Sequence, residues 1–157
     1  MKELGIQKTE GRIIIKNGRV IDPANKRDEV TDITINDGKI ESIGKAGSPD
    51  PKAQVIDAMG LIITPGLFDM HVHFREPGRE DEETIETGSR AAAAGGFTGV
   101  ACMPNTTPVV ENQGIVQLVK SRQTAYCGIY PVGAVTKGLE CQELAEMGDM
   151  FHAGAVA

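Results

Sequence analysis

The sequence predicts an α/β protein in two parts, a small β unit at residues 1–63 and alternating strands and helices at residues 64–157. The first part carries two Asn/Gly turn signals, at residues 17–18 and 36–38, each between short runs rich in isoleucine or valine. Such signals are typical of β-hairpins. After the Thr-Pro-Gly of residues 64–66, short apolar runs alternate with helical patterns, as in a parallel α/β sheet or barrel.

In the first part, short β-branched runs with alternating polar residues predict strands that share one buried face. A Gly-, Pro- and Ser-rich stretch at residues 44–53 is expected to be a loop between two of them. Because the turn signals join neighbouring runs, we expect one small antiparallel unit. The strands are expected at residues 13–15, 19–21, 33–35, 39–40, 54–57 and 61–63.

In the second part, acidic residues mark the start of the first expected helix and glycines mark the helix ends. The acidic run at residues 80–83 lies in or just before the first turn of the first helix, Gly95-Gly96 ends it, and Gly148 is expected to end the third. The helices are expected at residues 81–94, 112–122 and 139–147, and the strands at residues 67–73, 97–103, 126–132 and 153–157.

The length of the second part does not suffice for a closed barrel. At about 30 residues for each strand–helix unit, residues 64–157 hold about three units. A closed (β/α)8 barrel needs roughly 250 residues. The chain also ends inside an apolar run at residues 153–157, with no helix to cover it. We therefore expect an N-terminal fragment of a longer protein.

Charge and composition exclude several classes of function. The net charge of −6 argues against a sequence-independent grip on nucleic acid and against adsorption to anionic membranes. The N-terminus lacks the apolar stretch of a signal peptide, and no apolar run is long enough to span a bilayer, so we expect a cytoplasmic protein. Three widely spaced cysteines, Cys102, Cys127 and Cys141, are expected to be reduced and mostly buried.

The densest group of chemically active residues lies on the first strand of the second part. Asp69, His71 and His73 are two residues apart, so regular strand alternation places them on one face. Two imidazoles at the carboxyl end of a strand can chelate one ion such as Zn²⁺. Asp69, one step deeper, is expected to orient its neighbours as a carboxylate behind the ligands. The alternative is a chance pair of histidines on a strand.

Two further polar residues are expected at the same mouth. The guanidinium of Arg75 suits a substrate carboxylate, although a surface arginine paired with Glu76 or Glu80 is an alternative. Asn105 follows the second strand and can both donate to and accept from a ligand, or serve as a turn residue. His152 is expected at the start of a strand, the wrong end for the site, and is interpreted as structural.

Two longer motifs contain these residues: PGLFDMHVHFREPG at residues 65–78 and MPNTTP at residues 103–108. Together they resemble dihydroorotase of the bacterial, metal-dependent type in the amidohydrolase superfamily. His-x-His marks only the superfamily, whereas Arg-Glu-Pro-Gly and Met-Pro-Asn-Thr narrow the resemblance to dihydroorotase. The opening segments IIIKNGRVIDP and DITINDGKI are similar to the small β-sandwich part of the superfamily.

The resemblance implies a fold, a reaction and a set of roles. The fold would be an incomplete (β/α)8 TIM barrel at residues 64–157, preceded at residues 1–63 by part of a composite β-sandwich. The reaction would be the reversible interconversion of dihydroorotate and N-carbamoyl-L-aspartate in pyrimidine biosynthesis, by a metal-activated hydroxide. His71 and His73 would bind one or two zinc ions. His73, Arg75 and Asn105 would hold the substrate.

The same resemblance implies that the general acid and base, and the remaining metal ligands, lie downstream of residue 157. No catalytic residue of that kind is therefore expected here, and we expect the chain alone to be inactive and poorly stable. The partners would be the small-molecule substrate, with no nucleic acid or membrane, and in the intact parent a second copy or aspartate transcarbamoylase.

Two alternatives remain beside this interpretation. One is a related cyclic amidase, such as a hydantoinase, dihydropyrimidinase or allantoinase, from which Arg75 and Asn105 distinguish dihydroorotase. The other is a non-catalytic, dihydroorotase-like subunit that supports aspartate transcarbamoylase by contact. Such a subunit would have no reason to keep the chelating pair His71 and His73.

Overall fold

A computed structural model describes residues 11–45, 47, 51–122 and 126–157. The predicted loop at residues 44–53 therefore lies partly outside the described residues. The chain divides into two compact units, Met1–Pro65 and Gly66–Ala157, and the Thr-Pro-Gly of residues 64–66 lies at this division. Both units are described below, each by itself. None of the helices in the described ranges has the length and apolar character needed to cross a membrane.

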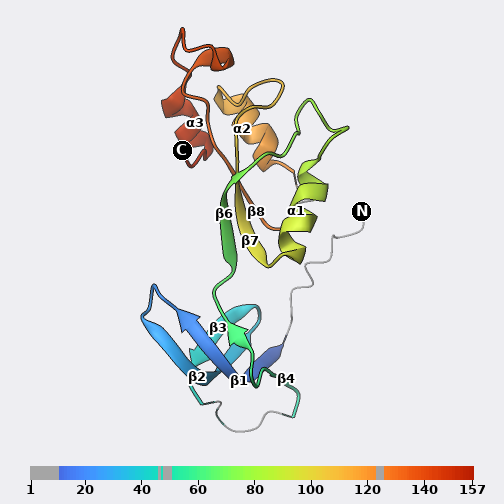
Figure 1. The fold of residues 1–157 in the computed structure, drawn as a ribbon, viewed down its shortest axis with the longest axis vertical. Coiled ribbons are helices and arrows are strands. Elements are labelled where there is room, and N and C mark those ends of the chain that lie inside the picture. Colours follow the sequence, from blue (N-terminus) through green and yellow to red (C-terminus); the bar gives the residue numbers. More distant parts are fainter. Residues whose placement is uncertain (1–10, 46, 48–50, 123–125) are drawn as a thin grey trace. The chain divides into compact units, whose positions relative to one another are not determined.

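The first unit is a single sheet built around one long strand (Figure 1). The strands are β1 (Arg12–Asp22), β2 (Arg27–Asn36), β3 (Lys39–Ile43), β4 (Gln54–Asp57) and β5 (Ile62–Ile63). Their order is β3-β2-β1-β4, and β5 also pairs with β1. Strands β1, β2 and β3 are antiparallel as predicted, but β4 and β5 run parallel to β1. The expectation of a purely antiparallel unit is therefore wrong.

The two turn signals of this unit have different outcomes. Asp37 and Gly38, with φ of 48° and 76°, form the two-residue turn between β2 and β3, as predicted. Asn17 and Gly18 do not form a hairpin, because β1 continues through them with a bulge, and the turn to β2 follows at residues 23–26. Asn17 has a φ of 64° and donates from its side chain to Asp57 Oδ1 at 3.0 Å. The positive φ that Asn favours here serves a bulge instead of a turn.

The second unit holds a three-stranded parallel sheet in the order β6-β7-β8 (Figure 1). Helix α1 contacts β7, and α2 contacts both β8 and α3. The mixed α/β class and the first three of the four predicted strands are confirmed, with small shifts of their ends. The bounds are β6 (Leu67–Val72), α1 (Ile85–Ala94), β7 (Phe97–Cys102), α2 (Gln113–Lys120), β8 (Gly128–Pro131), a 3-10 turn η1 (Lys137–Leu139) and α3 (Met147–Ala153).

Side-chain caps fix the starts of the first two helices. Thr84 caps α1: its hydroxyl accepts from the Thr87 backbone N–H at 3.0 Å, and the Thr87 hydroxyl accepts from the Thr84 backbone N–H at 3.1 Å. Helix α1 thus begins after the acidic run instead of within it. Asn112 caps α2 by accepting from the N–H groups of Gly114 and Ile115. Beneath these helices lies a core formed by Phe74, Ile85, Val100, Cys102 and Val119.

The end of the chain differs from the prediction. Residues 139–147 do not form a helix, because Leu139 and Cys141 adopt φ of 61° and 59°, outside the helical region. Helix α3 follows instead, and Gly154 ends it with a φ of 101°. The predicted strand at residues 153–157 is also wrong, because Ala153 belongs to α3 and residues 155–157 form no strand. Only Val156 and Ala157 bond to the segment at the end of β8, through Pro131 and Gly133.

Candidate metal and substrate site

The two histidines of the His-x-His motif lie at the carboxyl end of β6. His71 is the penultimate residue of the strand and His73 follows its last residue. Both side chains are exposed, and their Nε2 atoms are 3.2 Å apart. The ring planes make an angle of 62°, so the two rings do not stack. The strand therefore presents two imidazole nitrogens at one position.

This separation fits a shared metal ion. Two nitrogen ligands at about 2.0–2.1 Å from one zinc ion, at the tetrahedral angle, lie about 3.3 Å apart. The observed 3.2 Å between the two Nε2 atoms agrees with that value. Among the described residues, no group of three or more His, Cys, Asp or Glu side chains lies close enough together to hold a metal ion. The described residues thus bring together two nitrogen atoms that could serve as metal ligands.

Asn105 lies within hydrogen-bond distance of the imidazole of His73. It belongs to the loop after β7, and its Oδ1 lies 2.8 Å from Nδ1 of His73. A carboxamide oxygen can only accept, so Nδ1 of His73 carries the proton and Nε2 keeps its lone pair. A hydrogen bond to the second ring nitrogen of this kind orients a metal-binding histidine. The sequence placed Asn105 at this edge of the sheet, but spacing alone did not indicate the bond to His73.

Asp69 does not share a face with the histidines. The β6–β7 register pairs Asp69 with Val100 and Val72 with Cys102, so three steps on β6 match two on β7. This bulge breaks the alternation, and Asp69 comes to the same face as Val72. Both line a hollow of about 250 Å³ between the sheet and α1. The expected shared face is wrong, although Asp69 Oδ1 does accept from the His71 N–H at 3.0 Å.

Arg75 lies two residues beyond His73, next to an acidic group. Its Nε is 3.3 Å from Oε2 of Glu82, and about a third of the side chain is exposed. Arg79 also pairs with Glu82, so two arginines share this carboxylate. The alternative partners expected from the sequence, Glu76 and Glu80, are not the ones that Arg75 contacts through an ion pair. In this structure the carboxylate of Glu82 therefore lies beside the Arg75 guanidinium, which is expected to bind the carboxylate of the substrate.

His152 lies far along the chain from this group. It occupies the last turn of α3, where it is exposed and contacts the ring of Phe151, with 5.9 Å between ring centroids. The expected position at the start of a strand is wrong, because α3 extends through this residue.

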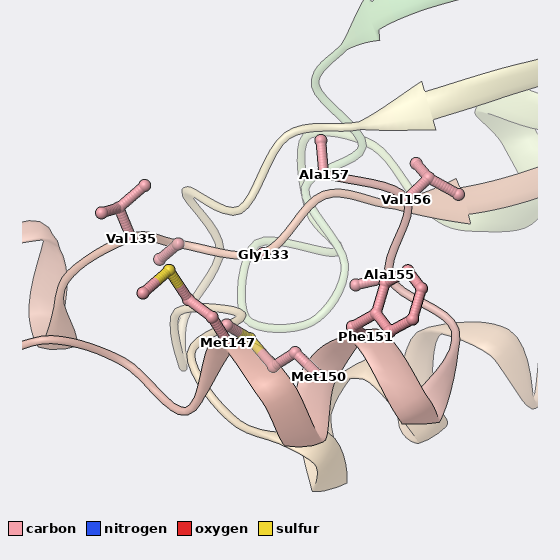
Figure 2. A pocket seen from close by; sticks show the side chains of 9 residues that line it. Gly133, Val135, Met147, Met150, Phe151, Ala155, Val156 and Ala157 are labelled. Carbon is pink, nitrogen blue, oxygen red and sulfur yellow. The ribbon is translucent and has the colours of Figure 1, made fainter.

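A second hollow, of about 230 Å³, lies between α3 and the segment after β8 (Figure 2). Figure 2 shows Met147, Met150 and Phe151 from the helix facing Val135 and the last residues of the chain. The lining carries no ionisable side chain, so no side chain there could transfer a proton.

The three cysteines form no disulfide with one another and differ in their exposure. All three are free thiols; Cys102 is buried, Cys127 is half-buried and Cys141 is exposed. Burial at the end of β7 raises the pKa of Cys102 to about 12. The expectation of mostly buried thiols therefore fails at Cys141, which lies in the irregular segment that replaces the predicted helix.

Comparisons with known proteins give consistent family relationships. A family model described as dihydro-orotase-like matches residues 60–157. The chain is 52% identical over 147 residues to a dihydroorotase of Geobacter sulfurreducens, a match that covers 92% of this chain and 35% of that relative. It is 53% identical over 147 residues to a dihydroorotase of Solibacter usitatus, covering 92% and 34%. The chain thus spans about a third of the length of the curated relatives that it matches.

Solved structures with similar folds include two hydantoinases. An L-hydantoinase (dihydropyrimidinase) from Arthrobacter aurescens matches with a TM-score of 0.74 and 28% identity, over 92% of this chain and 31% of that one. A D-hydantoinase (dihydropyrimidinase) from Thermus sp. matches with a TM-score of 0.61 and 33% identity, over 79% and 28%. With the family model covering more than half of the sequence and the histidine pair in place at the end of β6, the chain belongs to the dihydro-orotase-like family.

Proposed function

We propose that this chain supplies the first metal ligands and part of the substrate site of a dihydroorotase. The reaction is the reversible hydrolysis of dihydroorotate to N-carbamoyl-L-aspartate, in de novo pyrimidine biosynthesis in the cytoplasm. The observation that carries the proposal is the convergence of the two Nε2 atoms, with Asn105 behind His73. High identity to dihydroorotases over nearly the whole chain supports it.

In this proposal, β6, β7 and β8 are the first strands of a (β/α)8 barrel that is incomplete here. Residues 12–63 form part of a small β-sandwich that precedes it. The parallel order β6-β7-β8, with α1 and α2 in the connections, supports the barrel. In such barrels the functional groups lie at the carboxyl ends of the strands, where His73 follows β6 and Asn105 follows β7.

The chain's own residues would have separate roles. His71 and His73 would hold zinc, one or two ions in the complete site, through Nε2. Bound zinc would polarise the ring amide carbonyl and lower the pKa of a water molecule. Asn105 would keep the His73 proton on Nδ1 and leave its own amide N–H groups free for the substrate carboxylate. Arg75 would pair with that carboxylate in two parallel hydrogen bonds.

Asp69 would act through the backbone of His71, because its carboxylate accepts from that N–H and not from an imidazole. The small-molecule substrate is the partner that the site supports directly. In the intact protein, association with a second copy or with aspartate transcarbamoylase belongs to the same proposal.

Hydantoinase activity is the second candidate, since the solved structures above are hydantoinases. Two residues favour dihydroorotate as substrate. The ring of dihydroorotate carries a carboxylate that hydantoin and dihydrouracil lack, and Arg75 and Asn105 are groups that would recognise it. The identity of 52–53% to dihydroorotases also exceeds the 28–33% to the hydantoinases.

The test is a substrate comparison on the intact protein loaded with zinc. We expect kcat/KM for dihydroorotate to exceed that for hydantoin and dihydrouracil by about a hundredfold or more, because an analogue without the carboxylate leaves the polar groups that would bind it unpaired. Turnover of hydantoin at an equal or higher kcat/KM would establish the second candidate instead.

A further inference from the structure

The segment between His73 and α1 contains a nearly buried carboxylate that the proposed reaction does not use. Only 12% of the Glu76 side chain is exposed. Its Oε2 accepts from the backbone N–H of Ile85, the first residue of α1, at 2.9 Å. Its Oε1 lies 2.7 Å from Nε of Arg122, two residues after the end of α2. One side chain therefore ties this segment to the start of α1 and to Arg122 in the stretch after α2.

The next two residues bind the loop after β7. The carbonyl oxygen of Pro77, which is buried, accepts from the Thr107 N–H at 3.0 Å. Gly78 has a φ of 106°, and a Cβ at this position would collide with the backbone carbonyl oxygen of Thr107. Only glycine allows this approach of the two backbones. Residues 76–78, called the Glu76–Gly78 clamp below, thus contact Ile85 and Arg122 through Glu76, and Thr107 through Pro77 and Gly78.

The clamp lies between the two residues that are proposed to hold the substrate carboxylate. Arg75 directly precedes it, and Asn105 lies two residues before Thr107, to which it is bound. We infer that Glu76 and Gly78 are positioning residues, which fix the distance and angle between Arg75 and Asn105 and so determine how tightly a substrate carboxylate binds. This inference rests on the proposed function and adds two residues that touch neither substrate nor metal.

A defined effect follows from this arrangement. Groups that recognise a ligand must be held within about 0.5 Å of their productive positions by their supporting contacts. Releasing the clamp would let Arg75 move relative to Asn105, while β6 and the bond between His73 and Asn105 would stay in place. Substrate affinity would then fall, whereas metal content and the chemical step would be little affected.

The experiment uses the intact protein with four variants: Glu76→Gln, Arg122→Gln, their combination, and Gly78→Ala. Glutamine at position 76 keeps one oxygen to accept from the Ile85 N–H and replaces the charged oxygen that faces Arg122 with an NH2 group. We expect KM for dihydroorotate to rise roughly tenfold in Glu76→Gln, with kcat within about twofold and zinc content unchanged. The double variant should be no worse than the worse single one, since both remove the same ion pair. Glu140→Gln, an equal loss of charge at an exposed site, is the control.

Amide hydrogen exchange gives a second measurement that needs no turnover. In Glu76→Gln and Gly78→Ala, the Thr107 amide should exchange at least about tenfold faster than in the wild type, and that of Val100 in the sheet core should not change. Faster exchange at Thr107 with an unchanged KM would overturn the positioning role, as would unchanged exchange together with unchanged kinetics. A wild-type protein that binds zinc but leaves dihydroorotate intact would count against the proposed function, and the exchange at Thr107 would then still decide whether the clamp holds this loop.

Discussion

Nδ1 of His73 lies 2.8 Å from Oδ1 of Asn105, and this bond determines which nitrogen of the imidazole faces His71. With the proton on Nδ1, the lone pair on Nε2 points at the neighbouring ring, 3.2 Å away. His71 can then donate to it from its own Nε2, or both rings can present lone pairs to a metal ion. A residue of the loop after β7 thus fixes the tautomer of a histidine that follows β6.

Removing this bond should weaken metal binding without removing a ligand. In Asn105→Ala we expect zinc affinity to fall by about 10- to 100-fold, the usual effect of losing a hydrogen bond behind a metal-binding histidine. Competition with a chromophoric chelator measures this directly. Asn105→Asp keeps an acceptor at the same place and should retain most of the affinity. Equal affinity in Asn105→Ala and the wild type would show that His73 needs no partner at Nδ1.

Loss of either histidine should have a larger effect than loss of Asn105. His71→Ala and His73→Ala should each remove at least one equivalent of bound metal and abolish dihydroorotate hydrolysis, because a zinc ligand is lost. The matched control is His152→Ala, a change of the same type on the exposed last turn of α3. Metal analysis of the purified variants and circular dichroism separate the loss of metal from loss of fold. Full metal content with normal turnover in either variant would contradict the chelate.

At position 75, we expect that a positive charge alone is not sufficient to bind the carboxylate of dihydroorotate. Arg75→Lys should lower kcat/KM for dihydroorotate by roughly tenfold or more, since lysine cannot make two parallel hydrogen bonds to a carboxylate. Arg79→Lys, which alters the other arginine at Glu82, should change kcat/KM by less than about twofold. Steady-state kinetics would favour a surface role for Arg75 if both variants behaved alike.

Features of the sequence that depend on neighbouring residues were predictable, and those that depend on distant ones were not. The turn at Asp37 and Gly38 needs only two residues that accept a positive φ, so the sequence was sufficient. The similar signal at Asn17 and Gly18 became a bulge, because Asn17 is held by Asp57, a residue 40 positions away. A local pattern does not show which of these two structures the chain will form.

The site shows the same division. Strand alternation correctly brought His71 and His73 together, because they lie within two residues on one element. It failed at Asp69, because the bulge in β6 is visible only in the pairing with β7. The partner of Arg75 was also missed: Glu82 belongs to the irregular stretch before α1, which the sequence assigned to the helix itself. Contacts made by irregular segments carry no periodic signal in the sequence.

The cap of α2 provides a test of local stability. Asn112 Oδ1 accepts from the N–H groups of Gly114 at 2.9 Å and Ile115 at 3.2 Å, and these groups have no partner within the helix. Asn112→Ala should therefore lower the free energy of unfolding by about 1 kcal/mol, and Asn112→Asp or Asn112→Ser should restore most of it. Urea unfolding of the intact protein measures the difference. An unchanged midpoint in Asn112→Ala would show that tertiary contacts of α2 outweigh its cap.

The three thiols should differ sharply in their reaction with an alkylating reagent. Burial raises the pKa of Cys102 to about 12, so at pH 8 only about one molecule in ten thousand carries the reactive thiolate at this site. Cys141 is exposed and should be modified first by iodoacetamide, and Cys102 only as fast as the sheet opens. The folded state holds the Cys102 proton more tightly than the unfolded chain does. The stability that this thiol contributes is therefore complete below about pH 8.5, the pKa of a cysteine in the unfolded chain. It is lost as the pH rises towards 12, the pKa in the folded state. Peptide mass spectrometry after timed labelling gives the rates, with urea-unfolded protein as the reference in which all three cysteines react alike. Labelling of Cys102 as fast as Cys141 under native conditions would contradict its burial at the end of β7.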